Sequence, residues 1–576
     1  MSSDDEEFDF QDEEFETEFE ERADHVEEAV IRNGTATGDH FDDVIKDLLA
    51  RGLVLLVGPR GCGKTHLMRY AWLLALNDTS KPFCVYTTLN RYLSLEPWSR
   101  ARSDVNALFH SWTLARTLEA AMETHHRLTN RHFDVGAHLH LDVVDLPKLV
   151  NALERNFELD PQDEAVHRAL SVEALSTAIR AMAADSGRKR SVVLMDDAAM
   201  TLSPAFMTEF LDILRVLKAP DIAPKCSVYP GTTVFGPRFH ADHEGRFVSA
   251  WVSVADANYR SMMQTIAENR YPEGLENLSV DANALLQYAA FGIPRAYLTL
   301  LRSIRAEKTT TSQAAITKAI RMHRNNRLSE FRSLGDKVVE LRTLVRAGEE
   351  LFEAAIEGIR EANAKLAPKN TKQSMLGIDQ SEFDPLSERM IDLLTEAGLL
   401  FNEAEVSHGP DRQYRRFAPH LAALIANRAF SGGAKGSSSA AMVEFIERTA
   451  EKHPVRRGLK TLIGKTGATG LKLDLPPCQT CETPRESEKQ RFCQHCGTRL
   501  VDELIYSRIM DMDVTKVPAL SVFVIGRLKT SNFRTVGDIR AARDPGSELR
   551  KLEGIGEARS IKILAKVDSY VDEMMS

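Results

Sequence analysis

The stretch GPRGCGKT at residues 58–65 constrains this chain most, because it follows the apolar run LVLLV and precedes a helical pattern. A strand, a glycine-rich turn and a helix in this order form a phosphate-binding loop (P-loop), whose backbone N–H groups turn toward an anion. The helix adds the positive end of its dipole. The residues predicted to hold the nucleotide are Gly58, Pro59, Arg60, Gly61, Cys62, Gly63, Lys64 and Thr65.

Two acids at the end of a second apolar run complete the predicted site. In this site Lys64 reaches the β- and γ-phosphates, and the Thr65 hydroxyl binds Mg²⁺. The run VVLMDD ends in Asp196 and Asp197. An acid at the end of such a strand holds the shell of the Mg²⁺ ion, and Asp196 occupies that position. The sequence therefore predicts ATP and Mg²⁺ as ligands.

Apolar strands alternate with helical patterns around these motifs. Strand-like runs stand at 53–57, 82–89, 191–197 and 226–235, and residues 236–305 follow as an irregular loop and then helices. Alternation of this kind predicts an α/β core, in which a mostly parallel sheet carries helices on both faces.

Composition divides the remaining chain into further segments. The stretch SGGAKGSSSA has the glycine and serine content of a flexible linker, and a basic segment follows it. The predicted order is an acidic disordered tail at 1–22, the ATPase core at 23–235, a helical lid at 236–305, a helical and winged-helix-like domain at 306–430, a flexible basic linker at 431–477, a zinc ribbon at 478–500 and a helix-hairpin-helix domain at 501–576.

The formal net charge of −10 arises in the N-terminal tail. Residues 1–21 hold twelve of the 83 Asp and Glu and no Lys or Arg, so 73 basic residues face 71 acids in the rest of the chain. One interpretation of the tail is a disordered, solubilising leader. The other uses its phenylalanines, since acids interleaved with aromatic rings form nucleic-acid mimics and partner-binding segments.

The sequence also predicts a cytoplasmic protein without a membrane partner. No run approaches the roughly 18 apolar residues that a membrane helix needs. The acidic N-terminus is unlike a signal peptide, which begins with basic residues. Four of the seven cysteines stand in one late cluster, which is typical of a metal site in a reducing compartment.

The cysteine cluster has the spacing of a structural zinc site. Cys478 and Cys481 form one CxxC pair, and Cys493 and Cys496 form another. Two such pairs place four thiolates around one Zn²⁺ ion and leave no open position for catalysis. Either the metal only holds together a segment too small to fold alone, or the ribbon is a docking knob for nucleic acid or protein.

Two further stretches, CSVYPGTT at 226–233 and GIPR at 292–295, follow the P-loop and the acid pair in a fixed order. With a winged-helix-like segment behind them, they resemble the initiator-clade AAA+ ATPases of the origin-recognition type, over roughly residues 25–430. The resemblance implies a P-loop NTPase core with a helical lid, and it makes Arg295 a sensor of the γ-phosphate. The catalytic set is then Lys64, Asp196, Asp197 and Arg295.

The resemblance assigns further roles and shows one departure. Asp197 stands where AAA+ ATPases usually carry a Glu that orients the attacking water, so its shorter side chain implies slow turnover. Thr232 and Thr233 are candidates for the sensor-1 contact. Arg238 is a candidate arginine finger, which would act on a neighbouring subunit of a homo-oligomer.

The winged-helix-like segment at 390–426 suggests a DNA contact. In the family this domain binds duplex DNA, and Arg412, Arg415 and Arg416 stand on the expected wing. The alternative is a solvated strand face, because surface charge often serves only solvation. The basic stretch at 318–332 is a further candidate for the DNA-facing surface.

The last segment contains LEGIGEARSI, which fits a helix-hairpin-helix pattern and resembles the C-terminal domain of RNA polymerase alpha subunits. Gly554 and Gly556 would let the hairpin backbone approach a DNA phosphate, and Ile555 would anchor it. Arg559 and Lys562 follow as phosphate contacts. Such domains also bind proteins, so a protein partner at the C-terminal modules stays an alternative.

These features predict an ATPase with slow turnover that acts on DNA as a nucleotide-dependent switch or loader, in which case it would be associated with the nucleoid. The alternative is a signalling or defence NTPase, whose C-terminal modules sense a protein or nucleic-acid partner. A third interpretation is a scaffold that binds ATP for stability only. The cofactors expected are ATP, Mg²⁺ and Zn²⁺.

Overall fold

The computed structural model describes most of residues 26–575. The predicted acidic tail, Arg412 of the expected wing and most of the SGGAKGSSSA stretch lie outside the described residues. The residues not described are 1–25, 37, 99–101, 199–202, 234, 236–237, 307–312, 367–371, 408–412, 431–437, 449–453, 488–489, 491, 499, 501–504, 518–519, 543 and 576.

The core is a five-stranded parallel sheet, which confirms the predicted α/β class. The strand order is β2-β3-β4-β1-β5, and every neighbouring pair is parallel. The strands are β1 (Leu53–Val57), β2 (Phe83–Thr88), β3 (Ser191–Asp196), β4 (Ile222–Val228) and β5 (Gly245–Ser249). Parallel strands end at the same edge of a sheet, so the P-loop after β1 and the acids at the end of β3 lie on one side.

Two strands differ from the prediction. The fourth strand begins at Ile222 and ends at Val228, because Pro230 and Gly231 turn the chain where the sequence suggested a strand up to residue 235. The edge strand β5 was not predicted. Its residues Gly245 and Arg246 lack the apolar pattern of a buried strand, and Phe247 is 45% exposed. An edge strand does not need that pattern, because one side of it faces solvent.

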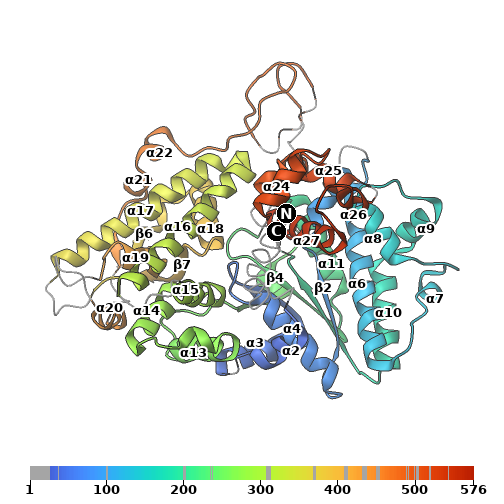
Figure 1. Ribbon diagram of the computed structural model, residues 1–576, viewed down its shortest axis with the longest axis horizontal. Helices are drawn as coiled ribbons and strands as arrows, with labels where there is room; N and C mark the ends of the chain where they lie inside the picture. Colours follow the sequence, from blue (N-terminus) through green and yellow to red (C-terminus); the bar gives the residue numbers. More distant parts are fainter. Residues whose placement is uncertain are drawn as a thin grey trace.

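Helices cover both faces of this sheet (Figure 1). Val54 and Leu56 of β1 point into one hydrophobic cluster, whereas Leu53 and Leu55 point into the other. This alternation follows from the period of two along a strand. The first cluster includes α2 (Glu28–Gly34), α3 (Asp39–Leu48) and α4 (Lys64–Asn77), and the second includes α6 (Val105–Thr129), α8 (Leu146–Glu154), α10 (Val172–Asp185) and α11 (Pro204–Leu217).

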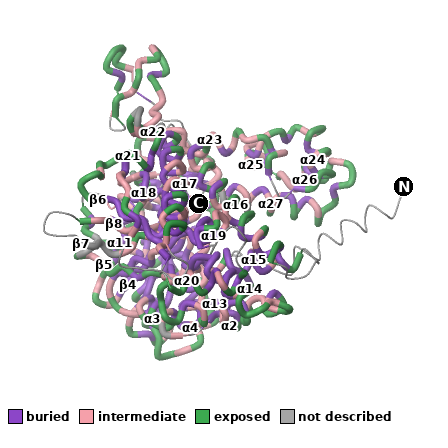
Figure 2. Tube along the Cα trace, turned by 90° about the vertical axis from the view of Figure 1, so that its left-hand side faces the viewer, coloured by how far each residue is buried: buried purple, intermediate pink, exposed green. Residues whose placement is uncertain are grey.

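The first cluster continues without a break into the helices after the sheet (Figure 2). It includes the predicted lid and the two long helices that follow it, so these parts share one core with the P-loop helix. The elements are α13 (Tyr259–Arg270), α14 (Val280–Ala290), α15 (Pro294–Ala306), α16 (Gln313–Lys337) and α17 (Arg342–Lys365).

A second, four-stranded sheet follows in the order β7-β8-β6-β9. The hairpin formed by β7 and β8 lies where the wing was expected, and the winged-helix assignment itself stays a prediction. The elements are β6 (Leu376–Asp379), α18 (Pro385–Glu396), β7 (Leu400–Ser407), β8 (Gln413–Pro419), α19 (Leu421–Ala426), α20 (Ser439–Glu447) and β9 (Val455–Arg456).

The predicted flexible linker is folded where the structure describes it. Val455 pairs with Leu376 in the second sheet, and two short helices, α21 (Leu459–Leu462) and α22 (Gly464–Thr469), lie against α17. The Thr466 hydroxyl donates to Glu350 of α17 over 3.0 Å. Gly and Lys content suggested flexibility, but each of these segments carries a few apolar residues that the larger core buries.

Five C-terminal helices pack on the second face of the core, where they share its hydrophobic cluster. Within the described residues, no helix has the length and apolarity needed to cross a membrane. The helices are α23 (Ile505–Met510), α24 (Val522–Lys529), α25 (Val536–Ala541), α26 (Pro545–Arg550) and α27 (Glu557–Met575).

Candidate functional site

The predicted P-loop has the backbone that phosphate binding needs. Gly61 and Gly63 have φ angles of 83° and 98°, which lie in the left-handed region that favours glycine. Gly63 is also the N-cap of α4, so the loop runs directly into the helix N-terminus. The N–H of Gly58 donates to the carbonyl of Val228 over 3.4 Å, which ties the loop to the end of β4.

Lys64 is held over its own loop. Its side chain is 8% exposed, and Nζ donates to the carbonyls of Gly58 (2.6 Å) and Pro59 (3.2 Å). The same amine lies 4.4 Å from the ring centre of Tyr229, which follows β4. These contacts keep a positive charge within the loop, where it can bind an anion. Thr65 follows as the second residue of α4.

Cys62 supports the loop from behind. It is 1% exposed, and a β-carbon added to Gly58 would lie 2.3 Å from its Sγ. Burial raises the pKa of this thiol, so Cys62 stays protonated and is neither a nucleophile nor a metal ligand. The small side chain also explains why position 58 must be glycine.

The two acids differ in their surroundings. Asp196 is 1% exposed and accepts a 3.2 Å hydrogen bond at Oδ2 from the hydroxyl of Tyr86, whereas its Oδ1 is buried without a hydrogen bond within the described part of the chain. Asp197 has a φ of 51°, and its Oδ2 accepts from the Thr88 hydroxyl over 3.5 Å. A buried carboxylate oxygen without a donor suits a Mg²⁺ ion or one of its water ligands.

The lid places Arg295 against the P-loop. The N–H of Arg295 donates to the carbonyl of Gly61 over 3.3 Å, and a β-carbon on Gly61 would lie 3.1 Å from Cβ of Arg295. The packing of Ile293 against the same glycine fixes the start of α15 on the loop. Residues 61 and 295, far apart in sequence, are therefore neighbours in space.

The turn after β4 uses its two threonines differently. Thr233 donates its hydroxyl to the carbonyl of Tyr229 over 3.0 Å, so it stabilises the turn itself. Thr232 faces the carboxylate of Glu396, the last residue of α18. The side chain of Arg238, the candidate finger, is 74% exposed and pairs with Asp212 over 3.2 Å. Its action on a neighbouring subunit stays a prediction.

Sequence reasoning missed Arg327 and Glu396, which both lie at this site. Arg327 of α16 donates to the carbonyl of Ala397 over 3.0 Å and pairs with Glu330 over 2.8 Å. Burial lowers its pKa against the influence of Glu330, and nearby Arg295 adds to the lowering. The basic stretch 318–332 suggested a DNA surface, yet this arginine points inward. No local motif marks either residue.

The four cysteines meet at one point. One sulfur from each residue lies within 4.8 Å of the other three, and neighbouring sulfurs are 3.3–3.5 Å apart. A tetrahedral Zn²⁺ at about 2.3 Å from each sulfur would separate the sulfurs by about 3.8 Å, so the cluster fits a metal of this kind. The residues are Cys478, Cys481, Cys493 and Cys496.

The two halves of this cysteine cluster are built alike. The N–H of Cys478 donates to Thr483 over 3.0 Å, and that of Cys493 donates to Thr498 over 2.8 Å. Glu482 and Gly497, at equivalent places, have positive φ angles of 56° and 70°. Each half is thus a tight turn that presents two sulfurs. The segment projects beyond the helices of the body (Figure 1).

The arginines of the predicted wing are partly committed. Arg415 forms an ion pair with Glu388, its side chain is 12% exposed, and its guanidinium lies 4.6 Å from the ring centre of Phe383. Arg416 of β8 is half-buried opposite Glu403. DNA contact by these arginines stays a prediction, and for Arg415 it would require the pair with Glu388 to open.

The predicted C-terminal hairpin forms between α26 and α27. Gly554 has a φ of 81°, Ile555 is 4% exposed as the expected anchor, and Gly556 leads into α27. Arg559 donates to the carbonyl of Gly554 over 2.6 Å, which closes the turn from inside. Lys562 is exposed on α27. Their contact with DNA stays a prediction.

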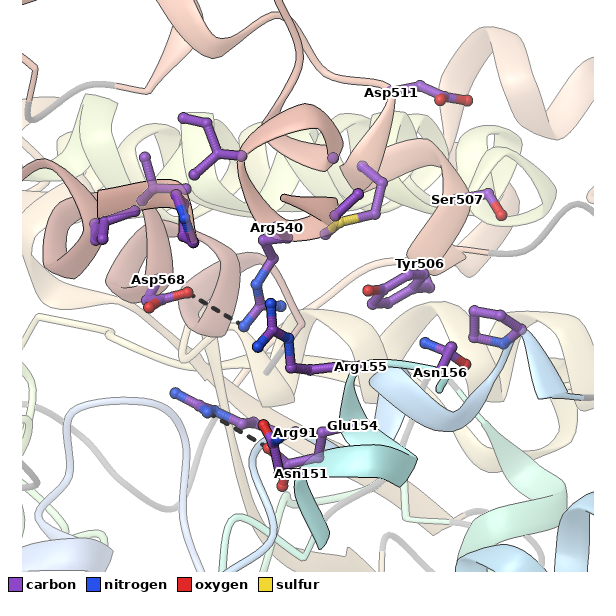
Figure 3. Close-up of a pocket in the computed structure, with 18 residues that line it drawn as sticks. Arg91, Asn151, Glu154, Arg155, Asn156, Tyr506, Ser507, Asp511, Arg540 and Asp568 are labelled. Carbon is purple, nitrogen blue, oxygen red and sulfur yellow. Dashed lines mark hydrogen bonds and ion pairs between the residues drawn. The ribbon is translucent and has the colours of Figure 1, made fainter. Parts of the chain in front are cut away.

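A cavity of about 610 Å³ lies between this C-terminal module and α8 of the core (Figure 3). Arg155 reaches across it and donates to the carbonyl of Ala542 over 3.0 Å. Arg540 pairs with Asp568 over 3.3 Å within the module. Because these arginines already have partners, their visible role is to join the module to the core.

Comparisons with known proteins find only distant structural likenesses. No family model and no curated protein matches the chain. A Walker-type ATPase of Pyrococcus abyssi is 15% identical, covering 67% of this chain and 94% of its own, with a TM-score of 0.34. Two Aeropyrum pernix proteins follow. ORC1 in complex with DNA is 14% identical over 69% of this chain and 94% of its own (TM-score 0.30), and ORC2 with ADPNP and ADP is 10% identical over 71% and 92% (TM-score 0.28). TM-scores this low decide nothing about this chain.

Proposed function

We propose that the protein binds and slowly hydrolyses ATP, as an AAA+-like switch or loader that acts on DNA. The observation that carries the proposal is the meeting of Lys64, Asp196 and Arg295 at one edge of the parallel sheet. These residues come from three separate segments, and each brings the chemistry that a nucleoside triphosphate with Mg²⁺ requires.

Each residue has a defined task in this proposal. Lys64 binds the β- and γ-phosphates, and Thr65 with Asp196 holds the Mg²⁺ shell. Mg²⁺ would neutralise charge that develops on the phosphates. Asp197 orients water with a shorter side chain than Glu, so turnover is slow. Arg295 reports the nucleotide to the lid through its backbone bond to Gly61.

The C-terminal modules supply the proposed DNA contacts and the second metal. Zn²⁺ would hold the four-cysteine segment as a structural ion, since no ligand position stays open. The proposed contacts to DNA phosphate are Arg415, Arg416, Gly554, Gly556, Arg559 and Lys562, and such contacts weaken as salt rises.

A signalling or defence NTPase is the second candidate, and one observation favours it. The C-terminal module is docked directly on the ATPase core through Arg155 and through Tyr506, whose N–H donates to Glu96 over 2.8 Å. A module that senses a partner could pass its state to the core through such contacts.

The ATPase rate with and without duplex DNA separates these candidates. We expect turnover that duplex DNA stimulates and that Lys64→Ala abolishes. Turnover that ignores DNA but rises with a protein partner would support the signalling candidate. If neither the protein nor Lys64→Ala turns over ATP, and both bind it equally poorly, the nucleotide site itself is refuted.

A further inference from the structure

The C-terminal end of α18 closes over the P-loop. A β-carbon on Gly398, just after this helix, would lie 3.5 Å from Cβ of Pro59. One turn earlier, Asp392 touches the turn after β4, since a β-carbon on Gly231 would lie 2.5 Å from its Oδ1. The helix is therefore seated on both the P-loop and the neighbouring turn.

Hydrophobic contacts hold the same seat from the side. The ring of Phe401, on β7 just after α18, meets the ring of Trp251 edge-on, with centres 4.6 Å apart. Trp251 in turn donates its Nε1–H to the carbonyl of Phe291 over 2.8 Å. The core, the lid and the second sheet thus meet within one contact group beside the loop.

Glu396, the last residue of α18, turns into this seat. Its carboxylate faces Thr232, Arg60 and Lys64. Burial raises the pKa of Glu396, whereas Thr232, Arg60 and Lys64 oppose the rise. A carboxylate so placed supplies negative charge to the amine that is expected to bind the β- and γ-phosphates.

The surrounding cations explain why an anion belongs here. Arg295 and Arg327 lie near Arg60, and the three reach the site from the lid, α16 and the P-loop. Nε of Arg327 is buried without a hydrogen bond among the described residues. Like charges gathered in partly buried space repel one another unless an anion lies among them. In this structure Glu396 supplies that negative charge at Arg60 and Lys64.

We propose that Glu396 makes the docked site selective for a nucleoside diphosphate over a triphosphate. The inference rests on the proposed nucleotide site and names what regulates it. A γ-phosphate adds negative charge beside Lys64, for which Glu396 already competes, so the two anions exclude one another. A triphosphate therefore binds with full affinity only after the end of α18 has left its seat.

This selectivity would couple the nucleotide to the second sheet. Helix α18 lies between β6 and β7, so displacing it moves the root of the β7–β8 hairpin. A triphosphate can favour the undocked state only by as much as its affinities for the two states differ. Glu396 supplies that difference, because it disfavours only the extra phosphate.

The test compares two Glu→Gln variants of one helix. Glu396→Gln removes the competing charge, and Glu388→Gln is the matched control, because Glu388 pairs with Arg415 away from the loop. Isothermal calorimetry on the full chain would measure ADP and a non-hydrolysable ATP analogue. We expect the wild type and Glu388→Gln to prefer ADP, and Glu396→Gln to bind the analogue at least about tenfold tighter with little change for ADP.

The outcomes separate this inference from the function on which it rests. If Glu396→Gln changes both affinities equally, or slows turnover without changing either, Glu396 does not discriminate and the inference is overturned while the nucleotide site stands. If the wild type binds neither nucleotide better than Lys64→Ala does, the proposed function fails and the inference falls with it.

Hydrogen exchange of the unmodified protein gives a test that does not depend on the folding of a variant. We expect the ATP analogue, but not ADP, to speed exchange of the amides in residues 385–399. Equal protection by both nucleotides would show that α18 stays seated with a triphosphate bound, and this would overturn the inference.

Discussion

The nucleotide site and the cysteine cluster are both predicted from short motifs, yet they are built in opposite ways. The cluster takes all its ligand atoms from residues 478–496, through two turns of the same design. The nucleotide site gathers residues from the P-loop at 58 to the helix end at 396, across two sheets and the lid. A local site depends on its metal, whereas a distributed site depends on domain packing. The predictions below test this contrast.

Removal of metal should have the largest effect, and only on the cluster. Its small hydrophobic group contains Cys478, Cys493 and Leu500, too little to fold without an ion that contributes about 10–16 kcal/mol. We expect Cys493→Ser to lose one Zn²⁺ per chain and amide protection over 478–498. Metal analysis and hydrogen exchange check this.

The body should not respond to the same change. His495→Ala is the control, because its side chain is outside the four-sulfur set, and it should keep the metal. A large drop in the melting temperature of the body on metal loss would show that the cluster supports the rest of the fold, and it would remove the contrast.

Loss of Phe401 should have an intermediate effect, and on the distributed site. Phe401→Ala removes the ring that meets Trp251, and we expect it to lower the free energy of unfolding by about 2–3 kcal/mol. Phe401→Leu should keep most of it. Urea unfolding measures both. A loss below about 0.5 kcal/mol for the alanine variant would mean that this contact does not hold the second sheet to the core.

The smallest effect concerns pH at the seat of α18. Burial and the neighbouring Glu388 raise the pKa of Asp392 to about 6, with Arg415 opposing and Glu396 adding. The folded protein therefore holds this proton more tightly than the unfolded chain, so the stabilisation present near pH 4 is lost as pH rises through 6.

Partial exposure of Asp392 limits this effect to about 1–2 kcal/mol. Asp392→Asn should remove the corresponding part of the pH dependence between pH 4.5 and 7 in urea unfolding. The exposed carboxylate Glu361 provides the control, since Glu361→Gln should leave the profile unchanged. If the two variants behave alike, Asp392 does not titrate at the interface.

Sequence prediction succeeded where one segment carries a complete pattern. The P-loop between β1 and α4, the acids that end β3 and the paired CxxC turns were all placed from spacing alone. It failed where contacts decide. The edge strand β5 has no apolar run, and residues 438–448 and 454–470 seemed flexible until α17 and β6 gave them a surface to cover.

By itself the sequence determined the two binding motifs and the α/β class, because strand–turn–helix geometry and cysteine spacing act over a few neighbouring residues. Only the tertiary structure decided which side chains surround the P-loop. Arg327 and Glu396 belong to no motif, and they reach the loop because one hydrophobic cluster joins the sheet, the lid and the second sheet. Packing over such long sequence separations determined which charges meet.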